Sequence, residues 1–345
     1  MKKKVALITG ITGQDGSYLA KALLKKNYEV HGLVRRSSVH KWQRLKFLQI
    51  IEKLNLVYGE MSEKVFIQKL IKNLKPDVMF NLAAQSFVQY SFDNPAYTNQ
   101  VNYDAVKNMT QCIIKNKLDT KFYQASTSEM FGNTNTTFQN EKTKFRPVSP
   151  YADSKLKSHM LIKNLRKTKN FFFCSGILFN HESPLRGSEF VTKKIISTLV
   201  AIKKGENKIL ELGNIYAKRD WGYAGDYIKA MMLMTESNRP EDFVVATGKS
   251  ISVKEFIIKA CEYLNLNIIF RGNELNERCY LKKNNKLIIK INKKYFRKKE
   301  LYSLKGDCEK IKKTLGWRHE SSIDDLIKKM IDGEQILRKS NLKYI

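Results

Sequence analysis

The sequence predicts an α/β fold in which a doubly wound parallel sheet carries a smaller C-terminal lobe. Short apolar runs of strand length alternate with amphipathic stretches of helical length, and nearly continuous apolar runs are typical of strands buried on both faces. The length of 345 residues also leaves room for a second lobe. In chain order, the predicted strands are residues 5–9, 29–34, 55–57, 78–82, 122–125, 171–178 and 243–246.

The first strand runs into Gly10, Gly13 and Gly16, and a helical pattern of apolar residues follows at once. Glycines at such a junction let the backbone turn tightly and approach a pyrophosphate, which the N–H groups of the helix N-terminus then bind. We therefore predict a Rossmann-like dinucleotide site at residues 10–16.

The end of the second strand indicates which dinucleotide binds. An NAD site usually has an acidic residue there, whereas this strand ends in Arg35, Arg36, Ser37 and Ser38. Two guanidinium groups and two hydroxyls suit a 2′-phosphate, which favours NADP. Two surface arginines are the alternative reading, and it leaves NAD open.

The strand at 122–125 is followed by Thr127, Ser128 and Glu129, and a later helical pattern begins with Tyr151 and Lys155. Residues four apart share one face of a helix. An ammonium group and an oxidised nicotinamide both stabilise a phenolate, so Tyr151 is expected to have a lowered pKa and to take a hydroxyl proton as hydride leaves the carbon.

The alternation of strands and helices breaks at residues 180–187, where turn formers and charges cluster. It resumes with a helical stretch at 226–234 and the strand at 243–246, after which we predict a helix at 253–264, an irregular basic segment near 271–300 and a helical tail from 307. We assign residues 1–179 plus about 224–250 to the dinucleotide-binding domain, and about 180–223 plus 251–345 to the second lobe.

Charge and composition limit the possible partners. Lysine and arginine outnumber aspartate and glutamate 63 to 33, which gives a net charge of +30. The lysines are spread along the chain without a nucleic-acid-binding motif, so we expect solvated surfaces and no nucleic-acid partner.

The five cysteines form no Cys-x-x-Cys pair, which indicates neither a metal site nor a disulfide framework and fits a reducing cytoplasm. No apolar run reaches the roughly 18 residues of a transmembrane helix, so we expect no membrane association.

The sequence closely resembles the extended short-chain dehydrogenase/reductase family and, within it, the GDP-mannose 4,6-dehydratases. The resemblance extends to about residue 330, and the blocks around Asn180 and Arg219 are its most specific parts. It rests on residues 9–16, 35–38, 81–86, 123–132, 149–151, 176–184 and 214–226.

The resemblance implies an NADP-dependent hydro-lyase that oxidises a GDP-linked hexose at carbon 4, eliminates water across carbons 5 and 6, and returns the hydride to carbon 6. Tyr151 would be the base at carbon 4, with Lys155 as its electrostatic partner and Thr127 bonded to the carbon 4 oxygen. Glu129 would remove the proton at carbon 5, with assistance from Ser128.

The resemblance also assigns binding residues, although packing at the lobe boundary is the alternative for His181. The cofactor residues are Gly10, Thr12, Gly13, Gln14, Asp15, Gly16, Arg35, Arg36, Ser37, Glu60, Leu82, Ala83, Ala84, Ser86, Tyr151, Lys155 and His181. The substrate residues are Gln85, Ser86, Glu129, Asn180, Lys193, Arg219, Arg297 and Glu300.

Departures from the family pattern leave the sugar and the assembly open. The segment at 265–295 matches poorly, so a GDP-manno-heptose is an alternative substrate. Residues 39–42 lack the usual Phe-Asn-Thr-like continuation that reaches a neighbouring subunit, so a homodimer is more secure than a homotetramer. A 4-epimerase or 4-keto reductase would need no Glu129, and a non-catalytic NADP-binding regulator would be expected to have lost Tyr151, Lys155 or Arg219.

Overall fold

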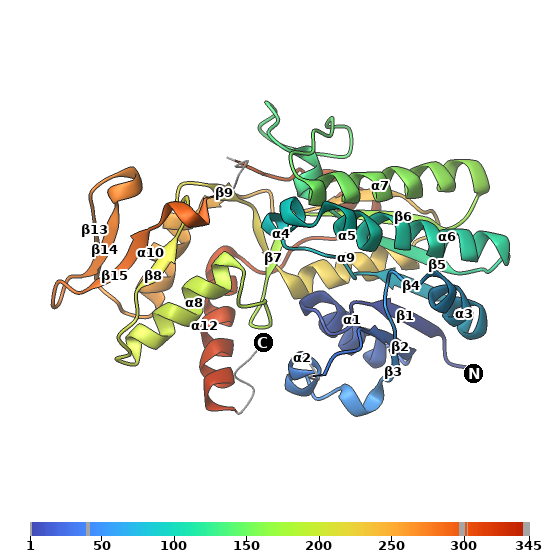
Figure 1. The fold of residues 1–345 in the computed structure, drawn as a ribbon, viewed down its shortest axis with the longest axis horizontal. Coiled ribbons are helices and arrows are strands. Elements are labelled where there is room, and N and C mark those ends of the chain that lie inside the picture. The colour runs from blue at the N-terminus through green and yellow to red at the C-terminus, as the bar shows by residue number, and fades with distance from the viewer. Residues whose placement is uncertain (1, 39–41, 297–300, 302, 341–345) are drawn as a thin grey trace.

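The computed structural model describes residues 2–38, 42–296, 301 and 303–340. Its centre is a seven-stranded sheet in the order β11-β6-β5-β4-β1-β2-β3, and every neighbouring pair is parallel (Figure 1). This confirms the predicted fold class. The strands are β1 (Val5–Thr9), β2 (Glu29–Val34), β3 (Asn55–Tyr58), β4 (Val78–Asn81), β5 (Lys121–Thr127), β6 (Phe173–Leu178) and β11 (Asp242–Val245).

Helices cover both faces of this sheet because successive strand residues alternate between two apolar clusters. One cluster joins the sheet to α1 (Gln14–Lys25), α2 (Gln43–Phe47), α9 (Ala224–Glu236) and α11 (Glu309–Leu315). The other joins it to α3 (Lys64–Leu74), α6 (Ala105–Lys115) and α7 (Pro150–Lys169). The shorter helical segments between these elements are η1 (Ile51–Lys53), α4 (Val88–Asp93), α5 (Pro95–Asn99), η2 (Gln100–Asp104) and η3 (Ser128–Phe131).

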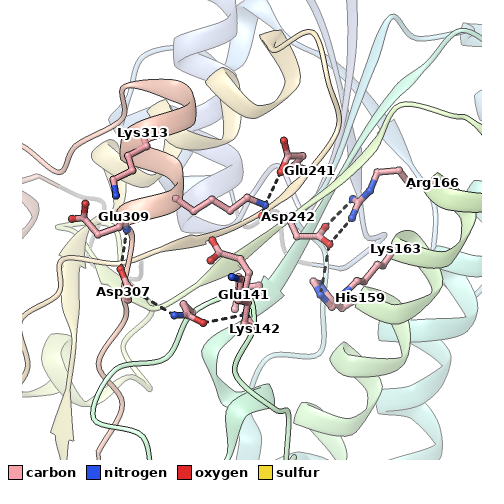
Figure 2. Close-up of a pocket in the computed structure, with 13 residues that line it drawn as sticks. Glu141, Lys142, His159, Lys163, Arg166, Glu241, Asp242, Asp307, Glu309 and Lys313 are labelled. Atoms are coloured by element: carbon pink, nitrogen blue, oxygen red, sulfur yellow. Dashed lines mark hydrogen bonds and ion pairs between the residues drawn. The ribbon is translucent and has the colours of Figure 1, made fainter.

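The edge strand β11 is covered by the loop before α7. A carboxylate oxygen of Glu141 accepts a hydrogen bond from the backbone N–H of Val244 at 2.7 Å. This contact occupies an edge N–H that would otherwise be open to pairing with another chain. Beside it lies a charged cavity of about 620 Å³, bordered by α7, β11 and α11 (Figure 2).

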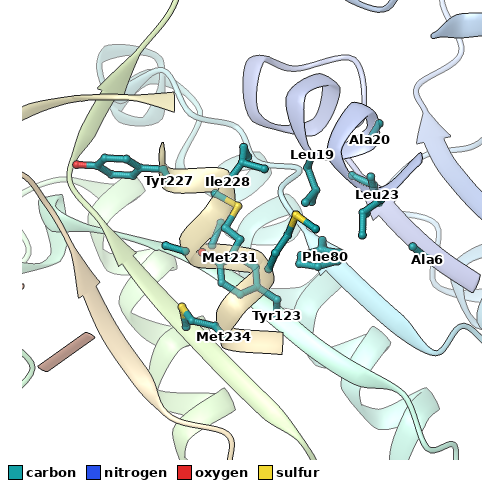
Figure 3. Packing of buried hydrophobic residues seen from close by; sticks show 14 of the residues in the cluster. Ala6, Leu19, Ala20, Leu23, Phe80, Tyr123, Tyr227, Ile228, Met231 and Met234 are labelled. Carbon is teal, nitrogen blue, oxygen red and sulfur yellow. The ribbon is translucent and has the colours of Figure 1, made fainter. Parts of the chain in front are cut away.

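The first apolar cluster contains more buried residues than the second. Tyr123 and Phe80 from the strands meet Leu19 and Leu23 of α1 and Met231 of α9, and all five side chains are at most 2% exposed (Figure 3). Burial of each such side chain stabilises the fold by about 1.5–3 kcal/mol. Strand ends above this layer are therefore rigid supports for a site.

A second lobe is built on a four-stranded sheet in the order β13-β14-β15-β8, packed against three helices through a separate apolar cluster. Its elements are α8 (Val191–Lys203), β8 (Leu210–Leu212), α10 (Val253–Tyr263), β13 (Ile268–Arg271), η4 (Glu274–Asn276), β14 (Arg278–Leu281), β15 (Leu287–Ile291), η5 (Lys293–Tyr295) and α12 (Ile323–Lys339). Two small sheets connect the lobes: β7 (Asn180–Glu182) with β10 (Trp221–Tyr223), and β9 (Lys218–Arg219) with β12 (Ile251–Ser252).

The prediction of an irregular segment near 271–300 was wrong for residues 278–291. This segment forms β14 and β15, because Cys279, Ile288 and Ile289 are buried in the apolar cluster of the second lobe. The surrounding lysines hid the strand pattern.

Candidate active site

A cleft of about 350 Å³ lies above the carboxyl ends of β1, β4, β5 and β6. The strand order reverses between β1 and β4, and ligands of open α/β sheets bind at such a point. The cleft brings together fifteen of the predicted site residues. They are Gly10, Gly13, Gln14, Asp15, Gly16, Leu82, Ala84, Ser86, Thr127, Ser128, Glu129, Tyr151, Lys155, Asn180 and His181.

The glycine loop forms one end of the cleft. Gly10 has φ +73°, and a Cβ there would lie 2.8 Å from the backbone nitrogen of Ala83. A Cβ on Gly16 would lie 2.2 Å from the Gly10 carbonyl oxygen, so the turn closes only with glycine at both positions. The N-terminus of α1 has no side-chain cap within the described chain, and Gln14, Asp15 and Gly16 of its first turn line the cleft.

The candidate catalytic groups come from β5 and α7. The Thr127 hydroxyl accepts a hydrogen bond from the Glu129 N–H at 3.3 Å, which turns the chain into η3 and brings Glu129 to the cleft wall. The Ser149 hydroxyl caps α7 by accepting from the Ala152 N–H at 3.1 Å. Tyr151 therefore lies in the first turn of α7.

Burial controls the protonation of both α7 groups. Burial raises the pKa of Tyr151 to about 12, and the nearby Glu129 adds to this, although a hydrogen bond with Thr127 opposes it. Burial lowers the pKa of Lys155 to about 8. The protein's own groups thus move the pKa of Tyr151 further above pH 7. This is opposite to the lowered pKa that the sequence led us to expect.

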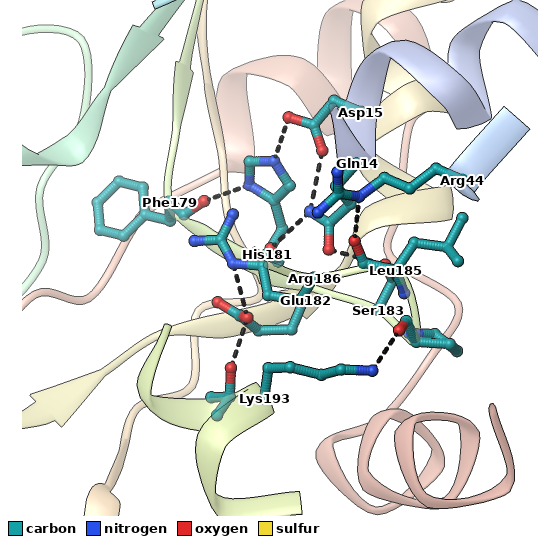
Figure 4. Close-up of polar contacts among 12 residues, drawn as sticks. Gln14, Asp15, Arg44, Phe179, His181, Glu182, Ser183, Leu185, Arg186 and Lys193 are labelled. Carbon is teal, nitrogen blue, oxygen red and sulfur yellow. Dashed lines mark hydrogen bonds and ion pairs between the residues drawn. The ribbon is translucent and has the colours of Figure 1, made fainter. Parts of the chain in front are cut away.

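His181 connects the glycine loop to the far wall of the cleft (Figure 4). One ring nitrogen lies 2.8 Å from a carboxylate oxygen of Asp15, and the other lies 2.7 Å from the Phe179 carbonyl oxygen. Burial disfavours the charged ring, but Asp15 and the two hydrogen bonds outweigh burial and raise the pKa of His181. The ring also stacks on Tyr227 with centroids 4.5 Å apart. His181 therefore both packs against Tyr227 and lines the cleft.

Other predicted residues do not line the cleft. Arg35, Arg36 and Ser37 are exposed beyond the end of β2. The buried Lys193 ammonium lies 2.9 Å from a Glu334 carboxylate oxygen and donates to the Pro184 carbonyl at 2.8 Å. The other residues away from the cleft are Thr12, Glu60, Ala83, Gln85 and Arg219. Arg297 and Glu300 lie outside the described residues.

Arg219 is buried on β9 and donates to the carbonyl oxygens of Lys218 and Leu301 at 2.8 and 2.7 Å. The neighbouring Asp220 accepts from the backbone N–H groups of Thr247, Gly248 and Gly306. Asp220 therefore fixes the turn after β11, a role that the sequence interpretation did not assign to it.

The sequence interpretation missed two arginines of the cleft wall. Arg44 donates to the carbonyl oxygens of Leu185 and Thr12, at 2.7 and 3.1 Å. Nε of Arg186 lies 3.0 Å from a carboxylate oxygen of Glu182. The guanidinium carbon lies over the Phe190 ring, 3.5 Å from the ring centroid. Arg186 follows directly on the block at 176–184, so a cation beside a strand end was the available signal. Arg44 had no such signal.

The described residues contain no cluster of histidine, cysteine or acidic side chains suited to a metal ion. Among them there is also no helix long and apolar enough to cross a membrane.

The fold resembles solved structures that contain nicotinamide cofactors. A dTDP-glucose 4,6-dehydratase from Streptomyces venezuelae, solved with NAD, has a TM-score of 0.81 at 19% identity and covers 99% of this chain and 98% of its own. RMD from Pseudomonas aeruginosa, solved with NADPH, has a TM-score of 0.73 at 19% identity, with coverage of 97% and 100%. These similarities concern the fold.

Sequence comparison is more specific. A family model described as GDP-mannose 4,6 dehydratase matches residues 7–330. GDP-mannose 4,6 dehydratase of Homo sapiens is 43% identical over 352 residues, which cover 98% of this chain and 93% of the human protein. The Sinorhizobium fredii enzyme is 42% identical over 338 residues, with coverage of 95% and 96%. The chain belongs to the GDP-mannose 4,6-dehydratase family.

Proposed function

We propose that this protein is a hydro-lyase that converts GDP-mannose to GDP-4-keto-6-deoxymannose. The observation that carries the proposal is the presence of the Glu129 carboxylate in one cleft with Tyr151, Lys155 and Thr127. A 4-epimerase or 4-keto reductase removes no proton from carbon 5 and needs no such carboxylate. Family membership supports the same reaction.

The protein groups divide the steps of this reaction among them. Bound nicotinamide cofactor supplies the acceptor, and later the donor, of the carbon 4 hydride. Tyr151 takes the proton of the carbon 4 hydroxyl, and Thr127 holds the oxygen. The resulting ketone acidifies carbon 5, so Glu129 can remove that proton and pass one to the hydroxyl leaving carbon 6, with Ser128 assisting.

We assign the cofactor to NADP. Arg35, Arg36 and Ser37 extend from the end of β2 without any acidic residue among them, and guanidinium groups bind phosphate oxygens two at a time. Arg44 and Arg186 add positive charge to the cleft wall. Related folds have been solved with NAD as well as NADPH, so a direct affinity comparison decides between the two.

The GDP portion is assigned to Asn180, Lys193 and Arg219 together with Arg297 and Glu300. Lys193 of α8 and Arg219 of β9 are buried cations near the junction of the seven-stranded sheet with the second lobe. We assign the dinucleotide to the lobe of residues 1–179 plus about 224–250, and the nucleotide sugar to the remainder. The substrate would then cross from one lobe to the other above Tyr151.

We further propose a homodimer that functions in the cytoplasm. Phe87, Tyr90, Tyr97 and Met160 are 38–48% exposed on or beside α4, α5 and α7. Large apolar side chains gathered on neighbouring helices are typical of subunit interfaces. The five cysteines are buried and unpaired, which suits a reducing compartment.

Mass spectrometry tests the reaction directly. Purified protein is incubated with NADP+ and either GDP-mannose or a GDP-manno-heptose, and the expected result is loss of one water from GDP-mannose. The Tyr151→Phe variant is the matched control, since it keeps the ring but loses the proton acceptor. Water loss from the heptose alone would redirect the assignment to that sugar, and loss from neither would overturn it.

A further inference from the structure

One side of α7 holds two consecutive residues of β5. The Lys155 ammonium donates to the Ala125 carbonyl oxygen at 3.0 Å. One turn later, Nδ1 of His159 lies 3.2 Å from the Ser126 hydroxyl oxygen. The next residue of β5 is Thr127, at the cleft. His159 therefore contacts the strand one residue before the reacting groups.

The surroundings of His159 indicate which ring nitrogen carries the proton. The side chain is 2% exposed, and its Nε2 lies 4.0 Å from a carboxylate oxygen of Asp242. Arg166 holds that carboxylate with two hydrogen bonds of 2.6 and 2.9 Å (Figure 2). A hydrogen on Nε2 faces this carboxylate, which leaves the Nδ1 lone pair to accept from the Ser126 hydroxyl.

The charged cavity beside β11 gives His159 a route to solvent protons. Its wall combines charged groups from four elements with His159 itself. The Phe145 ring packs edge-on against the imidazole, 5.4 Å away. The charged groups are Lys163 and Arg166 of α7, Glu241 and Asp242 at β11, Glu141 and Lys142 of the loop before α7, and Asp307, Glu309, Lys310 and Lys313 at α11.

We propose that His159 is a positioning residue for the dehydration reaction, which holds the end of β5 by accepting a hydrogen bond from Ser126 and weakens this hold when it is protonated from the charged cavity. The inference rests on the proposed function. In this proposal, protons reach His159 from solvent through the charged cavity, which is separate from the active-site cleft.

The direction of the pH effect follows from the ring. Burial lowers the pKa of His159, against the opposing influence of Asp242, so the ring is neutral near pH 7. As the pH falls through the pKa of His159, Nδ1 gains a hydrogen and donates to the Ser126 hydroxyl oxygen instead of accepting from it. The buried Ser126 hydroxyl hydrogen then loses its acceptor, so the anchor of β5 on α7 is weakened and turnover falls.

Two replacements of His159 separate positioning from packing. His159→Asn places an amide oxygen near Nδ1 and keeps the acceptor for Ser126, but it does not titrate. His159→Phe fills the space without an acceptor. We expect His159→Phe to lower kcat about tenfold with little change in KM, and His159→Asn to retain most of kcat while losing the His159-dependent part of the acid decline.

The measurement is a pH profile of kcat and of kcat/KM for both variants, with thermal melting and cofactor content as folding checks. Ser126→Ala tests the same contact with a smaller change, and adding it to His159→Phe should cause no further loss. His31→Asn is the matched control, because His31 pairs with Glu29 at 2.8 Å on β2, away from the cleft, and its profile should match the wild type.

Two results would overturn the proposal. Unchanged kcat in Ser126→Ala and His159→Phe would remove the positioning role. A wild-type acid limb in His159→Asn would remove the protonation step. Wild-type protein that binds cofactor yet dehydrates no GDP-linked sugar would instead contradict the proposed function, so the two failures are distinguishable.

Discussion

Lys155 donates to the backbone carbonyl oxygen of Ala125 at 3.0 Å, deep inside the protein. The contact ties α7, which carries Tyr151, to the strand that ends in Thr127. It also leaves the ammonium without a carboxylate among its hydrogen-bond partners in the described chain. Function therefore requires a buried cation that the fold itself does not favour.

Lys155→Met should stabilise the protein and abolish turnover. A pKa of about 8 in place of 10.5 corresponds to a cost of about 3 kcal/mol, and the lost hydrogen bond offsets about 1 kcal/mol. We expect a gain of about 2 kcal/mol in the free energy of unfolding at pH 7. The cost is complete below pH 8 and disappears as the pH rises to 10.5, so the difference between variant and wild type should shrink over that range in denaturant melts.

Lys193→Met is the matched control, and we expect it to change the free energy of unfolding in the opposite direction. Burial lowers the pKa of Lys193 too, but this ammonium pairs with Glu334 at 2.9 Å. Its removal leaves a buried carboxylate with less compensation, so the variant should be destabilised. A gain in stability for both variants, or for neither, would show that pairing does not distinguish the two lysines.

The arginines after β2 should select the cofactor. In the double variant Arg35→Ala with Arg36→Ala, the Kd for NADP+ should rise about 100-fold, because charge-assisted hydrogen bonds to the 2′-phosphate are lost, while the Kd for NAD+ stays unchanged. Isothermal titration measures both constants. Arg239→Ala removes an exposed arginine beyond α9 and controls for net charge. Equal weakening of NADP+ and NAD+ would contradict this assignment.

The glycine loop should separate folding from cofactor binding. A Cβ on Gly16 meets the backbone of Gly10 and Ile11 at 2.2 and 2.6 Å, so Gly16→Ala should cost about 1–3 kcal/mol of stability. A Cβ on Gly13 has a nearest contact of 3.1 Å, so Gly13→Ala should fold with a smaller loss. Both variants should lose cofactor, as judged by absorbance after denaturation. Retained cofactor in a well-folded Gly13→Ala would show that the phosphates lie elsewhere.

Local patterns were sufficient for most of the fold. The seven strands of the large sheet were predicted from short, mostly apolar runs, and their parallel arrangement from the alternation of these runs with helical stretches. Thr127, at a strand end, could be predicted for the same reason, whereas Asn180 was assigned by the resemblance to the family. Parallel strands direct their carboxyl ends to one edge.

The parts of the fold and of the site that were not predicted depend on contacts between residues distant in sequence. Lysines surround β14 and β15, whose apolar residues are buried only because α10 and the neighbouring strands cover them. Arg44 reaches the cleft wall through the carbonyls of Leu185 and Thr12, which no spacing in the sequence relates to it. At such positions, packing against residues distant in sequence determines the structure.

Glu129→Gln should stop the reaction after oxidation. The amide keeps the size of the side chain, which is 9% exposed at the cleft wall, but it cannot take the carbon 5 proton. We expect loss of water to slow by about 10²–10⁴-fold. Cofactor content should be unchanged, and reduced nicotinamide should accumulate in absorbance measurements after addition of GDP-mannose. Glu236→Gln is the control, because the exposed Glu236 carboxylate pairs with Lys26 and lies outside both the cleft and the charged cavity. Normal water loss in Glu129→Gln would assign the elimination to another group, with Ser128 the nearest candidate in the chain.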